Sequence, residues 1–409
     1  MANEGEKKEA VLKPRCIHGP CLLFSRLKKG VPIKYYACSA YRDRKQCSFY
    51  WPADRRFPLE KARQTLRLAR EMLRISHDDA AKNLSKIRKL NSKNRSFCFD
   101  CSRLLRDDES NDHDNHQLRK RITNRQLDRP SFWLPPVGDR RGEAQYWFTQ
   151  ETAHFLVKTV KRLPVDGVAC IGVPRLYELL HSSSDKRSFL LDIDDRYEQF
   201  FKPSDFARFN LFVSYFFTKE GKAHFKQFLE SCQHLLVVVD PPFGGLAKHV
   251  GKMLRTIERM HSVVHQSADI ACDFLWIFPY FLERRVIAAM PRLRMLDYQV
   301  EYENHPRFKA QSRKRVSPAR IFTSIDPASI PLPVHEGKYK FCNICKMFVA
   351  AENRHCQICG TCTSKNGRPY VHCFPCGKCV KATNVHCETC SICHRKGNCT
   401  AEENTQASE

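Results

Sequence analysis

An unbroken apolar run that ends in an acid and two prolines constrains the fold of this chain more than any other feature. The run, Leu235 to Val239, is typical of a strand that is buried on both faces of a parallel sheet. Asp240-Pro241-Pro242-Phe243 follows directly, and two prolines cannot continue a central strand. The acid is therefore predicted at the carboxyl edge of an open α/β sheet, where such sheets bind ligands.

These four residues have the chemistry needed to hold an amine. Asp240 and the Pro241 carbonyl can accept both hydrogens of an exocyclic amine while Phe243 stacks on the attached ring, which leaves the nitrogen lone pair facing an electrophile. The motif resembles the Asp-Pro-Pro-aromatic signature of class I, S-adenosylmethionine-dependent amino methyltransferases, which modify N6 of adenine or N4 of cytosine. The same residues can also form an ordinary strand-to-loop turn. The resemblance implies four catalytic residues: Asp240, Pro241, Pro242 and Phe243.

Alternating helix and strand signals over residues 143–330 predict a doubly wound sheet, the core of an α/β domain that we place at residues 128–330. The first strand ends at a glycine, which lets a ligand approach the backbone, although class I methyltransferases usually have a glycine-rich triplet there. The second strand ends in acids, which hold ribose hydroxyls in Rossmann-like folds, and an asparagine after the third strand can contact the cofactor's adenine. The predicted cofactor-binding residues are Ile171, Gly172, Pro174, Asp192, Asp194, Asn210 and Asp240.

Further elements of this domain follow from periodicity. We expect a helix from Gln150 and a strand over Asp273 to Tyr280, whose end could wall the acceptor pocket. Leu296 to Glu303 and Arg320 to Ser324 are expected to form a final antiparallel pair. One apolar helix stripe is expected in the core: Leu246, Val250, Leu254, Ile257 and Met260.

The charge and cysteine content of the chain limit its partners and its compartment. A net charge of +25 on 409 residues favours nucleic acid as a partner over an anionic membrane surface. No segment reaches the roughly 18 apolar residues that cross a bilayer, and the N-terminus lacks the apolar core of a signal peptide, so we expect the cytosol or nucleus. In such reducing compartments, 21 cysteines, many in CxxC pairs beside histidines, indicate zinc ligands rather than disulfides.

The first of these Cys/His groups lies in residues 14–56. Four potential ligands suffice for one tetrahedral zinc in a segment too short for its own core. Lysines, arginines and aromatic residues surround them, a mixture suited to unpaired nucleic acid. With the closing Trp51-Pro52-Ala53-Asp54, the string resembles a GRF-type zinc finger, a family associated with single-stranded nucleic acid, and Cys21 falls outside its pattern. The predicted ligands are Cys16, His18, Cys38 and Cys47.

A basic helical connector and a second zinc finger are predicted next. Residues 57–97 are interpreted as a solvated connector, or alternatively as an arm that grips RNA. Residues 98–120 resemble a C2H2 finger with unusually close histidines, and we expect a structural clamp because no recognition helix is evident. Proline-rich residues 128–142 are predicted to form a linker or lid. The ligands of this finger are Cys98, Cys101, His113 and His116.

A repeated Cys/His unit dominates residues 340–400. After Cys342-x2-Cys345, the unit His-Cys-x2-Cys-x2-Cys occurs three times. Because neighbouring His and Cys side chains diverge, each unit is expected to serve two metals, and closed four-ligand sites favour structure and RNA contact over catalysis. This predicts the sets Cys342, Cys345, His355 and Cys362; Cys356, Cys359, His372 and Cys379; Cys373, Cys376, His386 and Cys393; and Cys387, Cys390, His394 and Cys399.

Two other families share part of this spacing. It is similar to the cysteine-rich domain of palmitoyltransferases, but the Asp-His-His-Cys signature and membrane spans are absent from the sequence. Residues 376–390 are also similar to a CCHC knuckle with a longer middle gap, so the pairing of ligands stays open at this point.

The order of modules over nearly the whole chain resembles the CCHC zinc-finger-containing N6-adenosine methyltransferases of large-subunit ribosomal RNA. That resemblance implies a monomer that uses S-adenosylmethionine and several Zn²⁺ ions, acts on a structured stem-loop adenosine of ribosomal RNA, and resides in the nucleus or nucleolus and the cytoplasm. Two alternatives remain: a catalytically inactive zinc-based RNA scaffold, and a methyltransferase acting on DNA or a protein amide.

Overall fold

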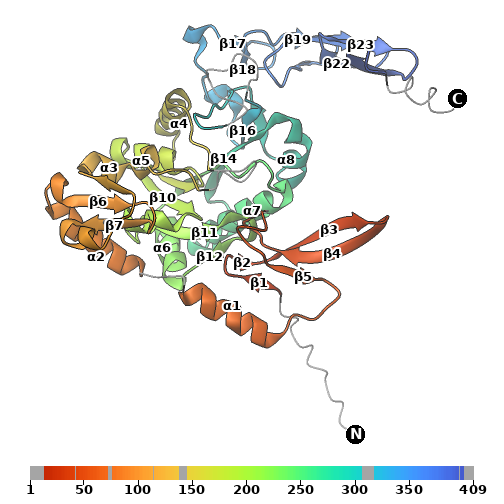
Figure 1. The fold of residues 1–409 in the computed structure, drawn as a ribbon. Helices are drawn as coiled ribbons and strands as arrows, with labels where there is room; N and C mark the ends of the chain where they lie inside the picture. Colours follow the sequence, from red (N-terminus) through yellow and green to blue (C-terminus); the bar gives the residue numbers. More distant parts are fainter. Residues whose placement is uncertain are drawn as a thin grey trace. The chain divides into compact units, whose positions relative to one another are not determined.

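The computed structural model describes residues 13–41, 43–71, 76–113, 115–137, 145–305, 317–395 and 397–399. These residues form two compact units (Figure 1). Unit 1 comprises Met1–Trp147 and Leu163–Cys272, and unit 2 comprises Phe148–Arg162 and Asp273–Glu409. Among the described residues, no helix is both long and apolar enough to cross a membrane.

Unit 1 is built on five strands in the order β12-β11-β10-β9-β13. The parallel strands are β9 (Gly167–Ile171), β10 (Arg187–Asp192), β11 (Phe206–Asn210) and β13 (His234–Val239), and β12 (Tyr215–Phe216) pairs antiparallel to β11. The apolar run of β13 is fully buried beside β9, which confirms the α/β prediction. Ile171 lies level with Leu191 and Val239, so these strands end at one edge of the sheet.

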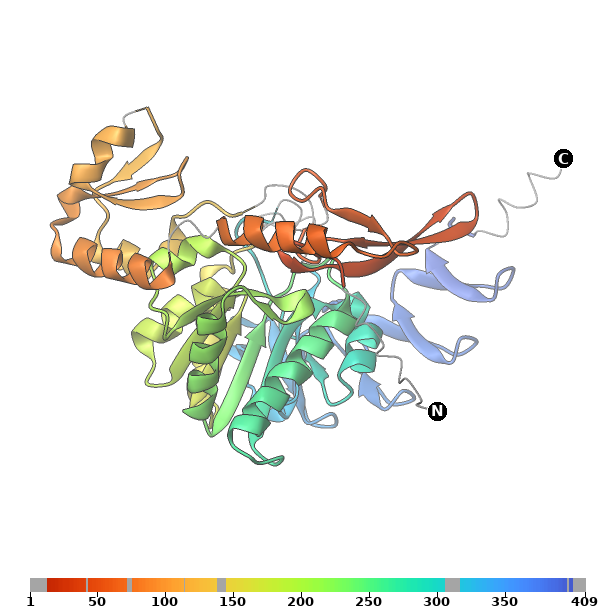
Figure 2. The same ribbon diagram turned by 90° about the horizontal axis from the view of Figure 1, so that it is seen from below.

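Helices cover this sheet. The helix α5 (Pro174–Ser183) follows β9, while α6 (Lys219–Glu230) and α7 (Ala247–Val264) pack on each other (Figure 2). The predicted stripe of α7 is buried at Val250, Leu254 and Ile257, but Leu246 is exposed because it precedes the first turn as the N-cap residue. The sequence did not lead us to expect α6 or β12. Short 3-10 helices η4 (Asp195–Gln199) and η5 (Leu211–Val213) follow β10 and β11.

The N-terminal zinc finger belongs to unit 1. It contains β1 (Arg15–Cys16), β2 (Gly19–Pro20) and a sheet of β3 (Leu22–Lys28), β4 (Val31–Ala37) and β5 (Tyr50–Pro52).

The connector consists of two helices, α1 (Leu59–Glu71) and α2 (His77–Lys89). The solvated interpretation fits α1, whose Leu66 and Leu68 are exposed. It is wrong for α2, because Leu84 and Ile87 are buried and the helix packs on η4. The predicted helical residues Met72, Leu73 and Ile75 lie outside the described residues.

The second finger is a small sheet anchored to the core of unit 1. The strand β6 (Arg95–Cys98) lies between β7 (Arg103–Arg106) and β8 (Leu118–Lys120) in this sheet. Along the chain, η1 (Ser92–Asn94) precedes β6, and η2 (Asp107–His113) connects β7 to β8. The Gln199 side chain accepts from Leu104 N at 2.8 Å and donates to Ser102 O at 2.8 Å. The chain continues through α3 (Asn124–Asp128) and η3 (Pro130–Phe132).

The predicted linker or lid is therefore partly ordered on the core. Ser131 in η3 donates its N–H and its hydroxyl to the buried Glu178 carboxylate at 2.9 and 2.6 Å. Burial raises the pKa of Glu178 to about 8. Residues 138–142 of this segment lie outside the described residues.

Unit 2 contains α4 (Gln150–Arg162), α8 (Glu283–Ala289), and the 3-10 helices η6 (Tyr280–Leu282), η7 (Pro327–Ser329) and η8 (Val334–Glu336). Its antiparallel strands follow the order β14 (Ala271–Pro279), β16 (Ala319–Thr323) and β15 (Arg294–Leu296). The predicted final pair was partly wrong. The partner of β16 is Arg294–Leu296. Beyond it, Val300 N donates to Ala319 O at 3.2 Å, and Tyr302 forms an isolated bridge with Phe148.

Four consecutive β-hairpins end the chain and follow one another in a row (Figure 1). They are β17 (Tyr339–Cys342) with β18 (Met347–Ala350), β19 (His355–Cys356) with β20 (Thr361–Cys362), β21 (Tyr370–Cys373) with β22 (Lys378–Lys381), and β23 (Asn384–Cys387) with β24 (Ile392–Arg395). The buried Asp297 carboxylate accepts from Ala350 N and Asn353 Nδ2, which holds the first hairpin on unit 2.

Candidate active site and metal centres

A cavity lies at the carboxyl ends of β9, β10, β11 and β13. Open α/β sheets bind their ligands at this edge. Most of the residues predicted from sequence line it: Ile171, Gly172, Asp192, Asp194, Asn210, Asp240, Pro241, Pro242 and Phe243. Pro174 is the exception, since it is buried as the first residue of α5 and is not among the lining residues.

The turn after β13 brings Asp240 against the end of β9. Asp240 N donates to Ile171 O at 3.2 Å. Gly172 has a φ of +65°, and a Cβ there would lie 3.2 Å from the Asp240 carbonyl oxygen. Glycine is therefore required for its backbone freedom and for this close approach. Gly172 alone therefore provides the backbone turn at this edge of the cavity, where class I methyltransferases usually have a glycine-rich triplet.

A second glycine closes the same turn. Gly245 N donates to Pro242 O at 2.7 Å. A Cβ on Gly245 would lie 2.6 Å from the buried Phe212 ring and 2.9 Å from Pro242 O. Both separations are below 3.0 Å, so a side chain at this position requires the ring or the backbone to shift.

We expect Gly245→Ala to lower the free energy of unfolding by roughly 1–3 kcal/mol, the usual cost of overpacking. Denaturant titration of the full chain measures it. The matched control is Gly244→Ala, at an exposed position outside the left-handed region, which should change stability by less than about 0.5 kcal/mol. Equal effects of the two substitutions would contradict the packing argument.

The two predicted ribose acids have different surroundings. Asp194 binds Arg196 through both carboxylate oxygens, at 2.9 and 2.7 Å, and also accepts from Arg196 N. Asp192 accepts from Asp194 N at 3.0 Å, and burial, followed by repulsion from Asp194, raises the pKa of Asp192 to about 7. Asp194 is thus committed to a local ion pair, which leaves Asp192 as the better candidate for holding hydroxyl groups.

The Asn210 side chain is engaged inside the protein. Its amide donates to His18 O and Ser39 Oγ, both at 2.9 Å, and its oxygen accepts from Phe212 N at 3.2 Å. Asn210 lines the cavity while it ties the end of β11 to the N-terminal finger. Its proposed contact with the cofactor's adenine stays a prediction.

Sequence reasoning missed several cavity residues. Gln145 and Tyr146 line one side, where Gln145 Nε2 donates to Asp194 Oδ2 at 3.3 Å and the Tyr146 ring lies 6.3 Å from the Phe243 ring at an angle of 41°. The aromatic string Tyr146-Trp147-Phe148 was a signal, but nothing local shows which ring faces the cavity. Ala40 and Tyr41 of the finger also line it and carried no signal.

The cavity is acidic in a basic chain. Three aspartates line it, and the described lining residues include no lysine or arginine, although the whole chain has a net charge of +25. Arg196 offsets the charge of Asp194, so Asp240 and the ionised form of Asp192 are the groups that favour a cationic ligand. S-adenosylmethionine, a sulfonium cation with a ribose and an adenine, fits these groups.

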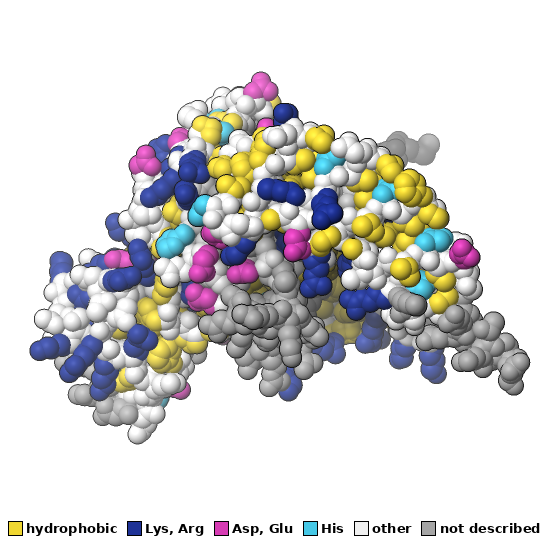
Figure 3. All heavy atoms as spheres, turned by 90° about the horizontal axis from the view of Figure 1, so that it is seen from above, with side chains coloured by type: hydrophobic (Ala, Val, Ile, Leu, Met, Phe, Trp, Pro, Cys, Tyr) yellow, Lys and Arg dark blue, Asp and Glu magenta, His cyan; other side chains and the backbone are white. Residues whose placement is uncertain are grey.

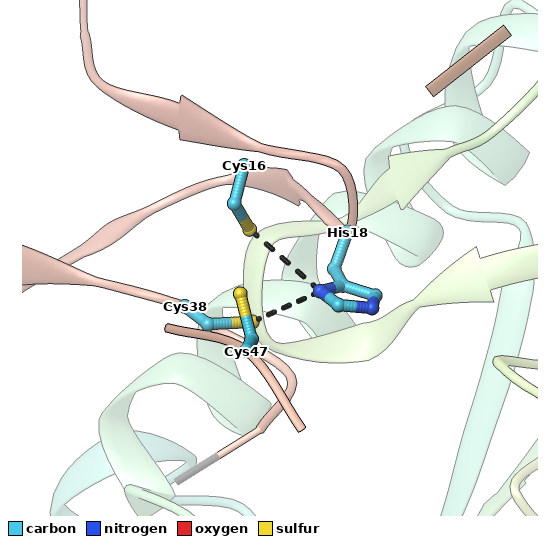
Figure 4. Close-up of side chains that lie close together, drawn as sticks. All are labelled: Cys16, His18, Cys38 and Cys47. Atoms are coloured by element: carbon cyan, nitrogen blue, oxygen red, sulfur yellow. Dashed lines mark hydrogen bonds between the residues drawn. The ribbon is translucent and has the colours of Figure 1, made fainter. Parts of the chain in front are cut away.

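The four predicted ligands of the N-terminal finger converge. Cys16, His18, Cys38 and Cys47 place their ligand atoms within 4.8 Å of one another (Figure 4). His18 Nδ1 lies 3.9 Å from Cys16 Sγ and 3.5 Å from Cys38 Sγ. Cys98, Cys101, His113 and His116 converge in the same way. Tetrahedral zinc with bonds of about 2.0–2.3 Å has ligand-to-ligand edges of about 3.5–3.8 Å, so both clusters could bind it.

The C-terminal hairpins bring together the sets expected from the interleaved spacing. Three sets have their ligand atoms within 4.8 Å, and each His-Cys unit splits between two of them. The edge from Cys359 Sγ to Cys379 Sγ is 3.8 Å, and that from Cys376 Sγ to Cys393 Sγ is 3.5 Å. In the fourth set, Cys387 Sγ lies 3.6 Å from Cys399 Sγ. These distances suit zinc, and the three converging sets follow the interleaved pairing.

Comparison with known proteins places this architecture in a family. Residues 139–313 match a family model described as probable N6-adenine methyltransferase. The chain is 38% identical over 376 residues to the Homo sapiens protein named rRNA N(6)-adenosine-methyltransferase ZCCHC4, which covers 88% of this chain and 73% of that protein. This chain belongs to the ZCCHC4 family. The family members of the same name from Xenopus tropicalis and Mus musculus are also 38% identical, over 84% of this chain and 73% and 70% of their own lengths.

The match to the N6-adenine methyltransferase model includes the cavity strands β9, β10, β11 and β13 and the motif that begins at Asp240. The similarity to the Homo sapiens ZCCHC4 protein covers 88% of this chain, whereas the methyltransferase model matches only residues 139–313. The similarity therefore extends into the Cys/His modules on both sides of this domain. The cavity described above therefore lies at the sheet of the methyltransferase domain of a ZCCHC4 family member.

Proposed function

We propose that this protein transfers a methyl group from S-adenosylmethionine to N6 of an adenosine in large-subunit ribosomal RNA. The observation that carries the proposal is the cavity at the carboxyl edge of the sheet. Asp240, Phe243 and Asp192, the candidate residue for binding the ribose, all line it. The relatives named as rRNA N(6)-adenosine-methyltransferases support the substrate class.

The residues at the cavity can align an amine without a strong base. Asp240 and the Pro241 carbonyl accept the two N6 hydrogens, so the nitrogen lone pair faces away from them. S-adenosylmethionine supplies, when bound, an electrophilic methyl group on a sulfonium. Because the amine becomes acidic only after it has been methylated, a carboxylate oxygen of Asp240 that already accepts the hydrogen can take the proton. Most of the acceleration then comes from alignment.

Two aromatic rings are placed to hold the base. A planar base needs about 3.5 Å on each face, so two rings that sandwich it lie about 7 Å apart. The rings of Tyr146 and Phe243 are 6.3 Å apart and tilted by 41°. A small rotation of either ring would admit an adenine that has been turned out of its helix. We assign the base to this gap.

The ribose assignment predicts a pH dependence. Since the pKa of Asp192 is raised to about 7, its carboxylate is largely protonated at pH 6 and ionised at pH 8. The ionised form accepts hydroxyl hydrogen bonds more strongly. We expect affinity for S-adenosylmethionine to rise roughly 5- to 10-fold from pH 6 to pH 8, measured by calorimetry. In Asp192→Asn this rise should disappear, leaving only the titration of the ligand itself; the same rise in both proteins would contradict the assignment.

Basic and aromatic surfaces support RNA as the partner. On the N-terminal finger, Tyr35 stacks on Tyr50 with ring centroids 5.1 Å apart, and Arg44 lies 4.9 Å from the Tyr50 ring. On the face shown in Figure 3, the lobe formed by α2 and β6–β8 presents more Lys and Arg side chains than acidic ones. Its exposed cations include Lys86, Lys89, Lys93 and Lys120, while Lys82 and Arg103 pair with Asp79 and Glu109. Stacking and phosphate contacts of this kind suit a structured stem-loop with an unpaired adenosine.

One experiment tests the proposal directly. The purified full chain is incubated with S-adenosylmethionine and ribosomal RNA from cells that lack the protein, and nucleosides are measured by mass spectrometry. We expect new N6-methyladenosine in large-subunit RNA. If the protein is an inactive scaffold, calorimetry should detect no binding of S-adenosylmethionine. If only DNA or protein is methylated, the proposed RNA substrate is wrong. We also propose that the chain acts as a monomer in the nucleus or nucleolus and in the cytoplasm.

A further inference from the structure

The N-terminal zinc finger forms part of the wall of the methyltransferase cavity. Ala40 and Tyr41 of the finger line the same cavity as Asp192 and Asp240. They follow the zinc ligand Cys38 by two and three residues. A module that the sequence presented as a separate nucleic-acid binder thus contributes side chains to a pocket built by a sheet far along the chain.

The zinc ligands hold Tyr41 in place. Tyr41 N donates to Cys38 Sγ at 3.3 Å, and the Tyr41 ring meets the His18 ring edge-on with centroids 4.6 Å apart. Both contacts are made to members of one metal cluster. The buried cluster against which Tyr41 packs consists of three cysteines, Cys16, Cys21 and Cys38, and two of these belong to the metal cluster. The position of Tyr41 therefore depends largely on the metal.

A buried polar network locks the finger to the sheet beside this residue. Asn210 donates to His18 O and Ser39 Oγ, and Ser39 Oγ donates to Pro20 O at 2.8 Å. Asn210 and Ser39 are almost completely buried, so breaking the network would leave polar groups unpaired at a cost. Gly19 reinforces the contact, because a Cβ there would lie 2.6 Å from the Tyr215 ring. The finger is therefore held at the end of β11 and the start of β12.

We infer that Tyr41 is a cofactor-binding residue, and that zinc in the N-terminal finger sets the shape of the cofactor pocket. The inference rests on the proposed function, because it names the nucleoside part of S-adenosylmethionine as the group that Tyr41 contacts. The ring lies at the side of the cavity where β10 ends in Asp192 and β11 ends in Asn210. A tyrosine here offers an aromatic face to a purine and a hydroxyl to its polar edge.

The test is the affinity of the full chain for S-adenosylhomocysteine, measured by calorimetry without RNA. Tyr41→Ala should weaken binding roughly 10-fold or more, as loss of a base-stacking ring does, while its zinc content stays that of the wild type. Tyr41→Phe keeps the ring, so its affinity for S-adenosylhomocysteine should fall less than that of Tyr41→Ala. The control Leu27→Ala changes an exposed residue of the same finger that does not line the cavity, and its affinity should be unchanged.

Hydrogen exchange on the wild-type chain gives a second readout that needs no substitution. Addition of S-adenosylhomocysteine should slow amide exchange around Ser39 to Tyr41. Wild-type affinity in Tyr41→Ala, or unchanged exchange at these residues despite binding, would overturn the inference and leave the proposed function standing. A wild-type chain that binds no S-adenosylhomocysteine and methylates no RNA would overturn both.

Discussion

Asp240→Ala is expected to reduce methyl transfer by roughly 10²- to 10³-fold or more. Asp240 lies half-buried at the end of β13, where its backbone is bonded to Ile171 and packed against Gly172. Removing its carboxylate deletes the acceptor that orients the amine, and the loss of one preorganised group in an active site typically has an effect of this size. The measurement is the single-turnover rate of N6-methyladenosine formation on ribosomal RNA.

A matched variant separates alignment from a general loss of the site. Asp240→Asn keeps the shape and one acceptor oxygen but replaces the other oxygen with a donor, so it should retain more activity than Asp240→Ala. Both variants should bind RNA with affinities close to wild type. If Asp240→Ala transfers methyl at the wild-type rate, the proposed amine-holding role is wrong.

Cys38→Ser is expected to have the second largest effect, by dismantling the N-terminal finger. The chain should lose one zinc per molecule, unfold at a lower temperature, and bind RNA and S-adenosylhomocysteine more weakly. Cys38 is 1% exposed and lies 3.5 Å from His18 Nδ1, within the four-ligand cluster. Metal binding supplies most of the folding free energy of such small modules, on the order of 10 kcal/mol, so no other contact in the finger can replace it.

Cys21→Ser is the control for this prediction. Cys21 is also buried and packs in the same small apolar group as Cys38, but it is not one of the four clustered ligands. Its zinc content, measured by elemental mass spectrometry, should equal that of the wild type. An unchanged zinc count in Cys38→Ser would show that this cysteine is not a ligand.

Some elements could be predicted because their signals are local. The five apolar residues before Asp240 can only be buried, and two prolines can only end the strand, so the acid at the sheet edge follows from a short segment. The interleaved ligand sets of the C-terminal hairpins follow in the same way, since a CxxC turn and a His-Cys pair fix where their side chains can point. The structure brings the same sets together.

Other features were missed because they depend on contacts between distant segments. The α2 helix has the charge of a solvated arm, yet Ile87 is buried because the helix finds a partner in η4. Asp192 and Asp194 are equivalent in sequence, and only the fold shows that Arg196 pairs with Asp194.

The sequence by itself determined the α/β core, the acid at its edge and the identity of the metal ligands, because each is encoded by residues a few positions apart. Only the tertiary structure decided what encloses the cavity: Tyr41 from the finger, and Tyr146 opposite Phe243. Their roles depend on how segments separated by about a hundred residues or more pack together, and that packing leaves no pattern in the local sequence.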